Sequence, residues 1–198
     1  TQSEILHNQL HKHTRPMVDR QNVHGVSERI SGGSYFMEKH IAPGTVLAPL
    51  SEKHIIEGVQ KLIVADVEVI GILFINSYID QTHEHRAKKI ALKLLAEAGK
   101  DIPVVCSSDI APVSKENNRL KSLLLQCFAA EHTRETIAAV EKTAISDGYD
   151  ARLLTLLSYG GAVNVEYPRL YETVISGPIG GMMGAQVMSN KLGLKKLS

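Results

Sequence analysis

The chain of 198 residues is long enough for one globular domain with a sizeable core. Its 22 basic and 21 acidic residues leave a net charge of +1, so it lacks the positive field that attracts nucleic acids or anionic membranes. Its two cysteines, Cys106 and Cys127, lie far apart in apolar stretches, which excludes a zinc pattern or a disulfide framework and favours a cytoplasmic protein. Every apolar run is shorter than the roughly 20 residues of a membrane-spanning helix.

The N-terminal region, residues 1–50, has an irregular pattern. We expect an opening helix, a strand within residues 22–31, a glycine turn at residues 31–34 that leads into a second strand, and a loop around residues 42–44. This region is expected to pack on the core that follows.

The clearest pattern begins at residues 67–75, which are almost continuously apolar and rich in β-branched side chains. Such a run is typical of a strand covered on both faces. Thr82 is expected to cap a helix with apolar residues at spacings of three and four, which ends at Gly99. Residues 102–106 form a second short apolar strand. These elements predict a βαβ unit with a right-handed crossover.

Further helices and one more strand are predicted after this unit. Residues 115–131 and 133–146 carry a helical apolar pattern, which indicates two helices or one bent helix. The side chains expected to face inward are Leu120, Leu124, Cys127, Phe128, Ile137, Val140 and Ala144. Residues 153–157 predict a third buried strand, followed by a sharp turn at residues 159–161. With the amphipathic helix predicted for residues 51–63, these elements indicate an α/β fold, a mixed sheet that contains the βαβ unit, with flanking helices.

A glycine-rich segment at residues 176–185 ends the predicted core. Ser176 is expected to cap a helix that begins near Ile179, with Pro178 tolerated in its first turn. Small residues recur every four positions on two neighbouring rows, Gly177, Gly181 and Ala185 on one and Gly180 and Gly184 on the other. Glycine costs about 0.5–1 kcal/mol in a helix relative to alanine, so a close contact should compensate for it. The partner is another helix or a phosphate at the helix N-terminus, and a flexible turn is the alternative.

Histidines occur in two clusters. His83 and His85 are two residues apart at a helix start, a spacing that puts them on different faces of the helix and argues against a zinc site. His7, His11 and His13 include a pair four residues apart, but a solvated polar terminus explains them at least as well. We therefore assign no metal ligand.

Two other groups of polar residues have simple structural explanations. Ser107 and Ser108 follow a strand end, where ligand sites of α/β sheets collect, but no Gly-x-Ser-x-Gly turn surrounds them. A strand-to-loop turn closed by Asp109 is the alternative. Glu116 and Arg119 are spaced to form an ion pair across the first turn of a helix, which contributes only a few tenths of a kcal/mol if it is exposed. The chain contains neither a Walker loop nor a Gly-x-Gly-x-x-Gly motif, so we assign no catalytic residue.

Several motifs follow one another in the order and spacing of a known family. They are Ile-Leu-Phe-Ile-Asn-Ser-Tyr at residues 72–78, His-Glu-His-Arg at 83–86, Ser-Ser-Asp-Ile-Ala-Pro at 107–112, and Ser-Gly-Pro-Ile-Gly-Gly at 176–181 with Gly-Ala at 184–185. On these motifs, the chain resembles the hydantoinase A / 5-oxoprolinase family over most of residues 15–198. Ser-Tyr-Gly-Gly at 158–161 and Tyr-Pro-Arg-Leu-Tyr-Glu-Thr at 167–173 are most similar to the β subunits of acetone carboxylases in that family.

The resemblance implies an ATP-using enzyme with an actin/sugar-kinase-like (ribonuclease H-like) fold, in which two Asp-x-Gly-Gly-Thr loops hold the nucleotide. Neither loop is in this sequence, which would be an internal fragment between them. The irregular region, residues 1–50, and an α/β core, residues 51–198, would then form one structural domain of a longer protein. ATP and Mg²⁺ are expected for the parent enzyme, and neither for the fragment alone. Ser176, Gly177, Gly180 and Gly181 would be cleft-facing or hinge residues of the glycine-rich helix.

The resemblance also implies an activity for the parent enzyme. It would phosphorylate a carbonyl or enolate oxygen, converting acetone and bicarbonate to acetoacetate together with other subunits. An ATP-dependent hydantoinase or 5-oxoprolinase that hydrolyses a cyclic amide is an alternative. A non-catalytic α/β interaction module is a second alternative, and the fragment alone is expected to be inactive.

Overall fold

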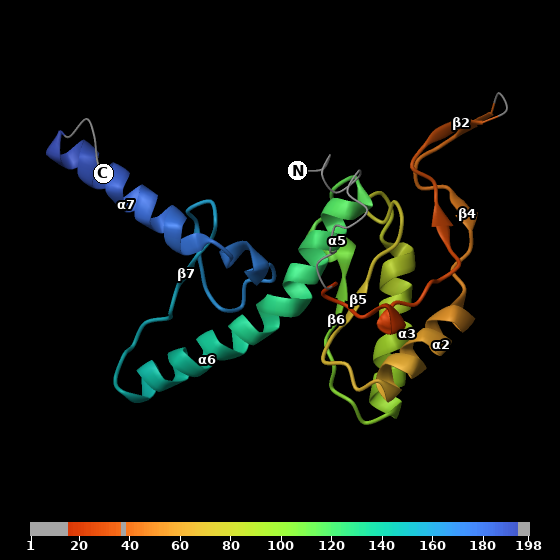
Figure 1. The fold of residues 1–198 in the computed structure, drawn as a ribbon, viewed down its shortest axis with the longest axis horizontal. Coiled ribbons are helices and arrows are strands. Elements are labelled where there is room, and N and C mark those ends of the chain that lie inside the picture. Colours follow the sequence, from red (N-terminus) through yellow and green to blue (C-terminus); the bar gives the residue numbers. More distant parts are fainter. Residues whose placement is uncertain (1–15, 37–38, 194–198) are drawn as a thin grey trace, which may run out of the picture.

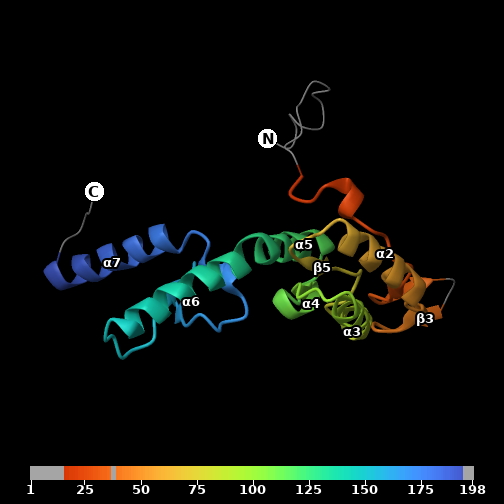
Figure 2. The ribbon, with the colours of Figure 1, turned by 90° about the horizontal axis from the view of Figure 1, so that it is seen from below.

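The computed structural model describes residues 16–36 and 39–193. The N-terminal helix expected in residues 1–50, the histidine cluster at residues 7–13 and the chain after residue 193 lie outside the described residues. Figure 1 shows two parts, which we call the core lobe (residues 16–125) and the C-terminal arm (residues 126–193). A long helix connects them, and Figure 2 shows the arm extending away from the core lobe along that helix.

The core lobe is built on the predicted βαβ unit. Strands β5 (Ile70–Ile72) and β6 (Val104–Cys106) pair in parallel, with Ile70 opposite Val104. Helix α3 (Thr82–Glu97) connects them, and α2 (Glu52–Val64) packs against α3. The predicted unit is confirmed, but both strands are shorter than expected, because pairing extends over only three residues of each.

The centre of the core lobe is one apolar cluster. It consists of Ile55, Val59, Ile70, Ile72, Phe74, Ala87, Ala91, Leu95, Ile102, Val104 and Cys106. The α3 members of the cluster recur at spacings of four, as the predicted amphipathic helix requires. Helix α2 is capped by Ser51, whose Oγ accepts a hydrogen bond from the His54 amide at 3.4 Å.

The N-terminal region contains short strand pairs rather than one long strand. β1 (Arg29–Ile30) pairs antiparallel with β4 (Val46–Ala48), and β2 (Ser34–Phe36) pairs antiparallel with β3 (Lys39–Ile41). Residues 20–22 form a short 3-10 helix. Of the strand expected in residues 22–31, only Arg29–Ile30 is present, because residues 23–28 pair with no other strand. The predicted glycine turn does lead into a strand.

The prediction of one mixed sheet is wrong for the described residues, which form four two-stranded sheets. The strand expected at residues 153–157 is reduced to β7 (Thr155–Leu156) and pairs antiparallel with β8 (Ala162–Val163) in the arm. The chain turns back at Gly160, whose φ of +92° suits a tight hairpin, so β7 pairs with the residues that follow it. Leu157 is buried beside this hairpin, whereas Leu156 is exposed.

A single continuous helix crosses from the core lobe into the arm. It consists of α5 (Glu116–Leu125), a π-helical turn η2 (Gln126–Ala130) and α6 (Glu131–Ser146). The predicted inward face is wrong at Leu120, Phe128 and Val140, which are exposed. The buried positions of this helix are Arg119, Leu123, Gln126 and Ala130. The face differs because a π turn shifts the helical phase and because α6 projects beyond the core lobe (Figure 2).

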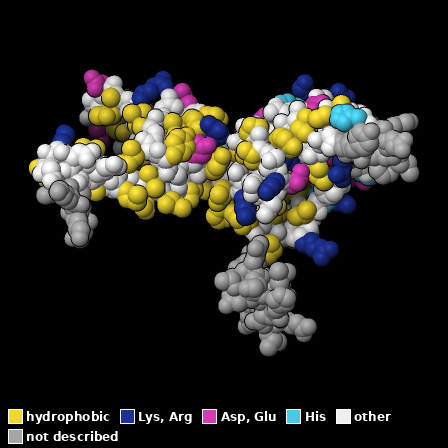
Figure 3. All heavy atoms as spheres, turned by 90° about the horizontal axis from the view of Figure 1, so that it is seen from above, with side chains coloured by type: hydrophobic (Ala, Val, Ile, Leu, Met, Phe, Trp, Pro, Cys, Tyr) yellow, Lys and Arg dark blue, Asp and Glu magenta, His cyan; other side chains and the backbone are white. Residues whose placement is uncertain are grey.

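The arm ends in the glycine-rich helix α7 (Ser176–Leu192), which follows a short 3-10 helix η3 (Leu170–Thr173). The helix begins three residues earlier than predicted. Ser176 is its first residue rather than its cap, because Ile175 occupies the cap position with φ +69° and no side chain caps the helix. No residue of α7 is buried, and the face of the arm in Figure 3 carries many hydrophobic side chains. Among the described residues, no helix has the length and apolar character needed to cross a bilayer.

Candidate functional site

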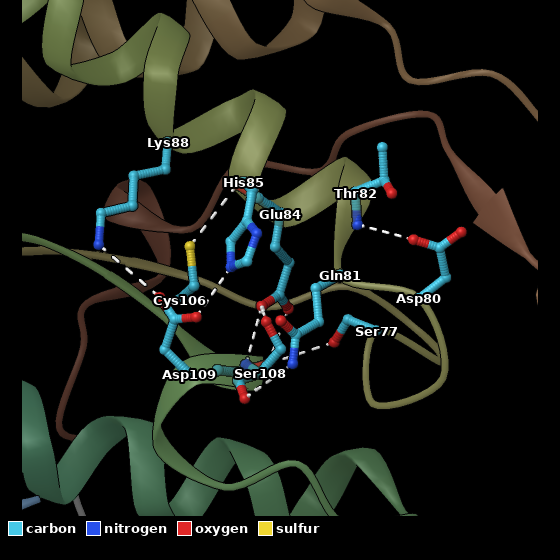
Figure 4. A network of polar contacts seen from close by, with 11 residues as sticks. Ser77, Asp80, Gln81, Thr82, Glu84, His85, Lys88, Cys106, Ser108 and Asp109 are labelled. Carbon is cyan, nitrogen blue, oxygen red and sulfur yellow. Dashed lines mark hydrogen bonds and ion pairs between the residues drawn. The ribbon is translucent and has the colours of Figure 1, made fainter.

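The most elaborate polar site lies at the carboxyl ends of β5 and β6. The β5–α3 loop (residues 73–81) leaves one strand, and the one-turn helix α4 (Ser107–Ile110) leaves the other. The first turn of α3 packs over both segments (Figure 4). In open α/β sheets, this edge is where ligands bind, because loops from neighbouring strands converge there.

Glu84 is the centre of this site and is fully buried. Its Oε1 accepts hydrogen bonds from the Phe74 amide at 2.8 Å and from Ser107 Oγ at 2.7 Å. Its Oε2 accepts from the amide and the hydroxyl of Ser108, at 2.9 and 2.7 Å (Figure 4). Four donors around one carboxylate compensate the cost of removing it from water. Glu84 thereby ties both strand ends to α3.

Arg119 holds the other side of the same loop. Its guanidinium is fully buried and donates from Nη2 to the Phe74 carbonyl at 2.7 Å and from Nη1 to the Val113 carbonyl at 3.0 Å. It also lies over the ring of Tyr78, 5.5 Å from the centroid. Glu116 lies 3.9 Å away and is partly exposed. The predicted pair between Glu116 and Arg119 is therefore present, with the arginine buried. Arg119 Nε has no hydrogen-bond partner among the described residues.

His83 and His85 each contact a different carboxylate. His83 Nδ1 lies 2.9 Å from Glu28 Oε2 in a buried contact, and His85 Nε2 lies 2.8 Å from Asp109 Oδ1 at the surface. Lys88 lies 3.8 Å from the second oxygen of Asp109. Within the described ranges, no three His, Cys, Asp or Glu side chains come together in a way that could hold a metal ion.

Two more groups complete the surroundings of Glu84. The prediction that Thr82 caps α3 is wrong, since Thr82 is the first residue of the helix and Gln81 occupies the cap position without a side-chain cap bond. Asp80, just before the cap, accepts from the Thr82 amide at 2.8 Å. Hydrogen bonds from Thr82 lower the pKa of Asp80 below its ordinary value of 3.8. Burial, with Glu84 and Asp109 nearby, raises the pKa of Cys106 to about 12, so this thiol is neutral at physiological pH.

The glycine-rich residues lie elsewhere. Ser176, Gly177, Gly180 and Gly181 occupy the first turns of α7. This helix belongs to the arm, whereas α3 lies in the core lobe (Figures 1 and 2). A Cβ on Gly180 would lie 2.9 Å from Leu156 Cδ1, whereas a Cβ on Gly177 or Gly181 would meet no atom within 4 Å. Of these three glycines, only Gly180 therefore makes the close approach that was expected for this face. The structure does not bring these residues together with the Glu84 site.

A second polar cluster holds the arm together. The hydroxyls of Tyr159 and Tyr167 donate to Glu172 Oε2 at 2.9 and 2.7 Å. Arg169 Nη2 in turn donates to the Tyr167 hydroxyl at 2.8 Å. Hydrogen bonds with Tyr167 and Glu172 raise the pKa of Tyr159, so it remains a neutral donor. This cluster fastens the β7–β8 hairpin to η3.

The sequence analysis missed Glu84 and the burial of Arg119, although both left a signal. Glu84 is in phase with Ala87, Ala91 and Leu95, the buried positions of α3. Arg119 is in phase with Leu123 and Gln126 on the buried face of α5 and η2. A charged residue within a buried helical stripe needs buried partners, so phase would have identified both.

Comparisons with known proteins agree with this architecture. Residues 2–95 match the model of the hydantoinase/oxoprolinase N-terminal region, and residues 119–197 match the hydantoinase/oxoprolinase model. The chain belongs to the hydantoinase/oxoprolinase family. Glu84 lies within the first matched range, and Arg119 is the first residue of the second.

Relatives in this family include two carboxylase subunits. The acetone carboxylase beta subunit of Xanthobacter autotrophicus is 32% identical over 98% of this chain and 26% of its own length. The acetophenone carboxylase gamma subunit of Aromatoleum aromaticum is 25% identical over 92% of this chain and 24% of its own length. The chain thus spans about a quarter of the length of these relatives.

Two solved structures are similar in fold. A nucleotide-free structure of acetone carboxylase, from work on ATP-dependent acetone carboxylation, matches 96% of this chain and 26% of its own with a TM-score of 0.82 and 31% identity. An ATP-dependent caprolactamase from Pseudomonas jessenii matches 96% of this chain and 27% of its own, with a TM-score of 0.69. At 17% identity, the second likeness concerns the fold alone.

Proposed function

We propose that this chain is part of a subunit of an ATP-dependent enzyme that activates a carbonyl or enolate oxygen by phosphorylation. The preferred reaction joins acetone and bicarbonate to give acetoacetate. One observation carries the proposal, the likeness to acetone carboxylase over nearly the whole chain at a TM-score of 0.82 and 31% identity. ATP would supply a phosphoryl group that turns a poor leaving group into a good one.

In the proposed enzyme, ATP and Mg²⁺ bind at two Asp-x-Gly-Gly-Thr loops, which the sequence of this chain does not contain. The Glu84 carboxylate accepts four hydrogen bonds from groups of the protein. No three potential metal ligands gather in the part of the chain that the structure describes. The proposed role of this chain is therefore to form the wall of the catalytic domain and its hinge helix, and we derive no phosphoryl-transfer step from it.

Helix α7 is the proposed hinge. Gly177 and Gly181 present an open surface without side chains, which would allow a second helix to approach closely and slide. Ser176 would lie at the cleft beside Gly177, and Gly180 faces Leu156 inside the arm. We further propose that the whole subunit has the actin/sugar-kinase-like fold.

The assembly and compartment of the whole protein are part of the same proposal. Its partners would be other carboxylase subunits, because the relatives are named as beta and gamma subunits. Neither Cys106 nor Cys127 forms a disulfide, which suits the reducing cytoplasm.

Hydrolysis of a cyclic amide is a second candidate, supported by the fold of the caprolactamase. The test is ATP hydrolysis by the intact subunit together with its partner subunits. We expect acetone plus bicarbonate to stimulate ADP release and to yield acetoacetate. Stimulation by caprolactam, hydantoin or 5-oxoproline instead would support the amide reaction. If no carbonyl substrate or cyclic amide alters ATP turnover, the chain is a non-catalytic module and the proposal fails.

A further inference from the structure

The β5–α3 loop is held by two buried charges of opposite sign. Glu84 accepts from the Phe74 amide, and Arg119 donates to the Phe74 carbonyl. Both side chains are fully buried. The main chain of one residue is therefore fixed at both its donor and its acceptor by ionic hydrogen bonds, which are stronger and more directional than neutral ones.

The rest of the loop is also constrained. Ser77 Oγ donates back to the Phe74 carbonyl at 3.1 Å and lies 3.5 Å from Ser107 Oγ. Asn76 adopts φ +62° and donates from Nδ2 to the Ile30 carbonyl at 2.8 Å. Asparagine adopts the left-handed conformation more readily than most other residues, and the hydrogen bond of its side chain holds it in place here.

Stability alone does not explain this arrangement. Each buried ion costs several kcal/mol of desolvation, and the nearest carboxylate to Arg119 is 3.9 Å away and partly exposed. Arg119 Nε also lacks a hydrogen-bond partner among the described residues. Apolar side chains of similar volume would hold a loop at lower cost. What the two ions provide is a defined position of the loop at the carboxyl edge of the strand pair, where α/β folds bind ligands.

We propose that Glu84 and Arg119 are positioning residues that fix the β5–α3 loop as a ligand-facing segment of the catalytic domain. This inference rests on the proposed function. Within residues 73–81 only Phe74 and Ser77 are buried, so most of the loop is partly exposed. Its Tyr78 ring lies against Arg119. Gln81 Nε2 donates a hydrogen bond to the Ser108 carbonyl at 3.5 Å, which uses one of the two amide hydrogens and leaves the second for a ligand.

The experiment uses the intact subunit with its partner subunits and two variants of the loop supports, Arg119→Lys and Glu84→Gln. Lysine keeps the charge of Arg119 but loses the planar fork that reaches two carbonyls. Leu95→Ala is the matched control, because Leu95 is 2% exposed in the same lobe and packs in the apolar cluster, but its side chain contributes no hydrogen bond to the loop.

We expect Arg119→Lys to lower kcat roughly tenfold or more while changing the KM for ATP less than about threefold, as misplacement of a loop does. Leu95→Ala is expected to lower the unfolding midpoint at least as much and to leave kcat unchanged. If the activities of all three variants simply follow their unfolding midpoints, the two residues are only structural and the proposal is overturned.

Hydrogen exchange gives a readout that does not depend on turnover. Exchange in a peptide covering residues 73–81 should slow on adding ATP with acetone and bicarbonate, and should quicken in Arg119→Lys but not in Leu95→Ala. Slowing in a complex that does not carboxylate acetone would contradict the proposed reaction but keep the loop as a ligand-facing segment. Unchanged exchange in an active complex would contradict the loop assignment alone.

Discussion

Glu84 and Arg119 are joined through the main chain of Phe74, which donates its amide hydrogen to the carboxylate at 2.8 Å and accepts from the guanidinium at 2.7 Å. Two charges from different helices therefore act on one peptide segment at the end of β5. The Glu84 carboxylate also accepts hydrogen bonds from Ser107 and Ser108, so it connects the end of β5 with the end of β6. The edge of the strand pair depends on these two side chains.

The first prediction concerns stability. Glu84→Gln replaces one of the two acceptor oxygens with an NH₂ group. In one orientation of the amide, this group faces the two donors of Ser108, and in the other it faces the donors of Phe74 and Ser107. We expect the free energy of unfolding to fall by about 2–4 kcal/mol, since hydrogen bonds to a charged group are lost in a buried site. Urea denaturation of the 198-residue chain measures this change.

Glu97→Gln is the control for this substitution. Glu97 lies at the end of the same helix, its side chain is 59% exposed, and it pairs with Lys93 at 3.8 Å. Its replacement should change the free energy of unfolding by less than about 0.5 kcal/mol. Equal effects of the two substitutions would contradict the importance of the Glu84 hydrogen bonds.

The second prediction concerns the two thiols. Cys106 is fully buried and its pKa of about 12 keeps it protonated, whereas Cys127 is half-buried beside an open groove next to Leu124 and Phe128. Iodoacetamide at pH 8 should therefore label Cys127 first and Cys106 only after unfolding in urea. Peptide mass spectrometry distinguishes the sites, and Cys127→Ser is expected to leave the folded chain unlabelled. Equal labelling rates would show that Cys106 is accessible.

The third prediction compares two glycines. Gly160→Ala should destabilise the arm by about 1–2 kcal/mol, because φ +92° disfavours a side chain and the new methyl would meet Met183 Cε at 2.7 Å. Gly181→Ala, whose methyl would meet nothing within 4 Å, should stabilise the 198-residue chain by about 0.5–1 kcal/mol. Thermal unfolding of both variants checks the difference.

Gly181→Ala also tests the proposed hinge. In the intact subunit, a methyl group on the face where another helix approaches should lower ATP turnover, although the same change stabilises the isolated chain. Turnover equal to that of the unmodified subunit would show that Gly181 is not at a close helix contact.

The fourth prediction concerns pH. The folded pKa of Asp80 is held below 3.8 by Thr82, so its charge stabilises the fold above that pH and loses this effect as the pH falls through the folded pKa. Asp80→Asn keeps an acceptor for the Thr82 amide but removes the charge near the helix N-terminus. We expect a loss of about 0.5 kcal/mol at pH 7 that disappears below the folded pKa. Urea titrations at several pH values, with Asp150→Asn at an exposed position as control, measure it.

The spacing of apolar residues along the chain predicted the βαβ unit but not the partner of the third strand. The βαβ unit followed from the apolar run at residues 67–75 and from the stripe of Ala87, Ala91 and Leu95. The third strand failed because Thr155 and Leu156 pair with the residues just after Gly160 rather than with the central strands, and the choice between these partners is not encoded in apolar periodicity.

The candidate site was less predictable. The sequence analysis placed Ser107 and Ser108 correctly at a strand end but considered Glu84 only as part of a histidine cluster. The partners of Glu84 come from segments 10 to 24 residues away, so their convergence depends on tertiary packing. The role assigned to Ser176, Gly177, Gly180 and Gly181 stays a prediction.

The π turn at Gln126–Ala130 has a geometric consequence for the whole molecule. Each residue of an α-helix advances the azimuth by about 100°, so the length of the turn sets the angle at which α6 leaves α5. Deleting one residue there would swing the arm by about that angle around the helix axis and carry α7 to another side of the core lobe. The number of residues in the π turn therefore sets the direction of the arm around the helix axis, and with it the direction that the glycine face of α7 takes.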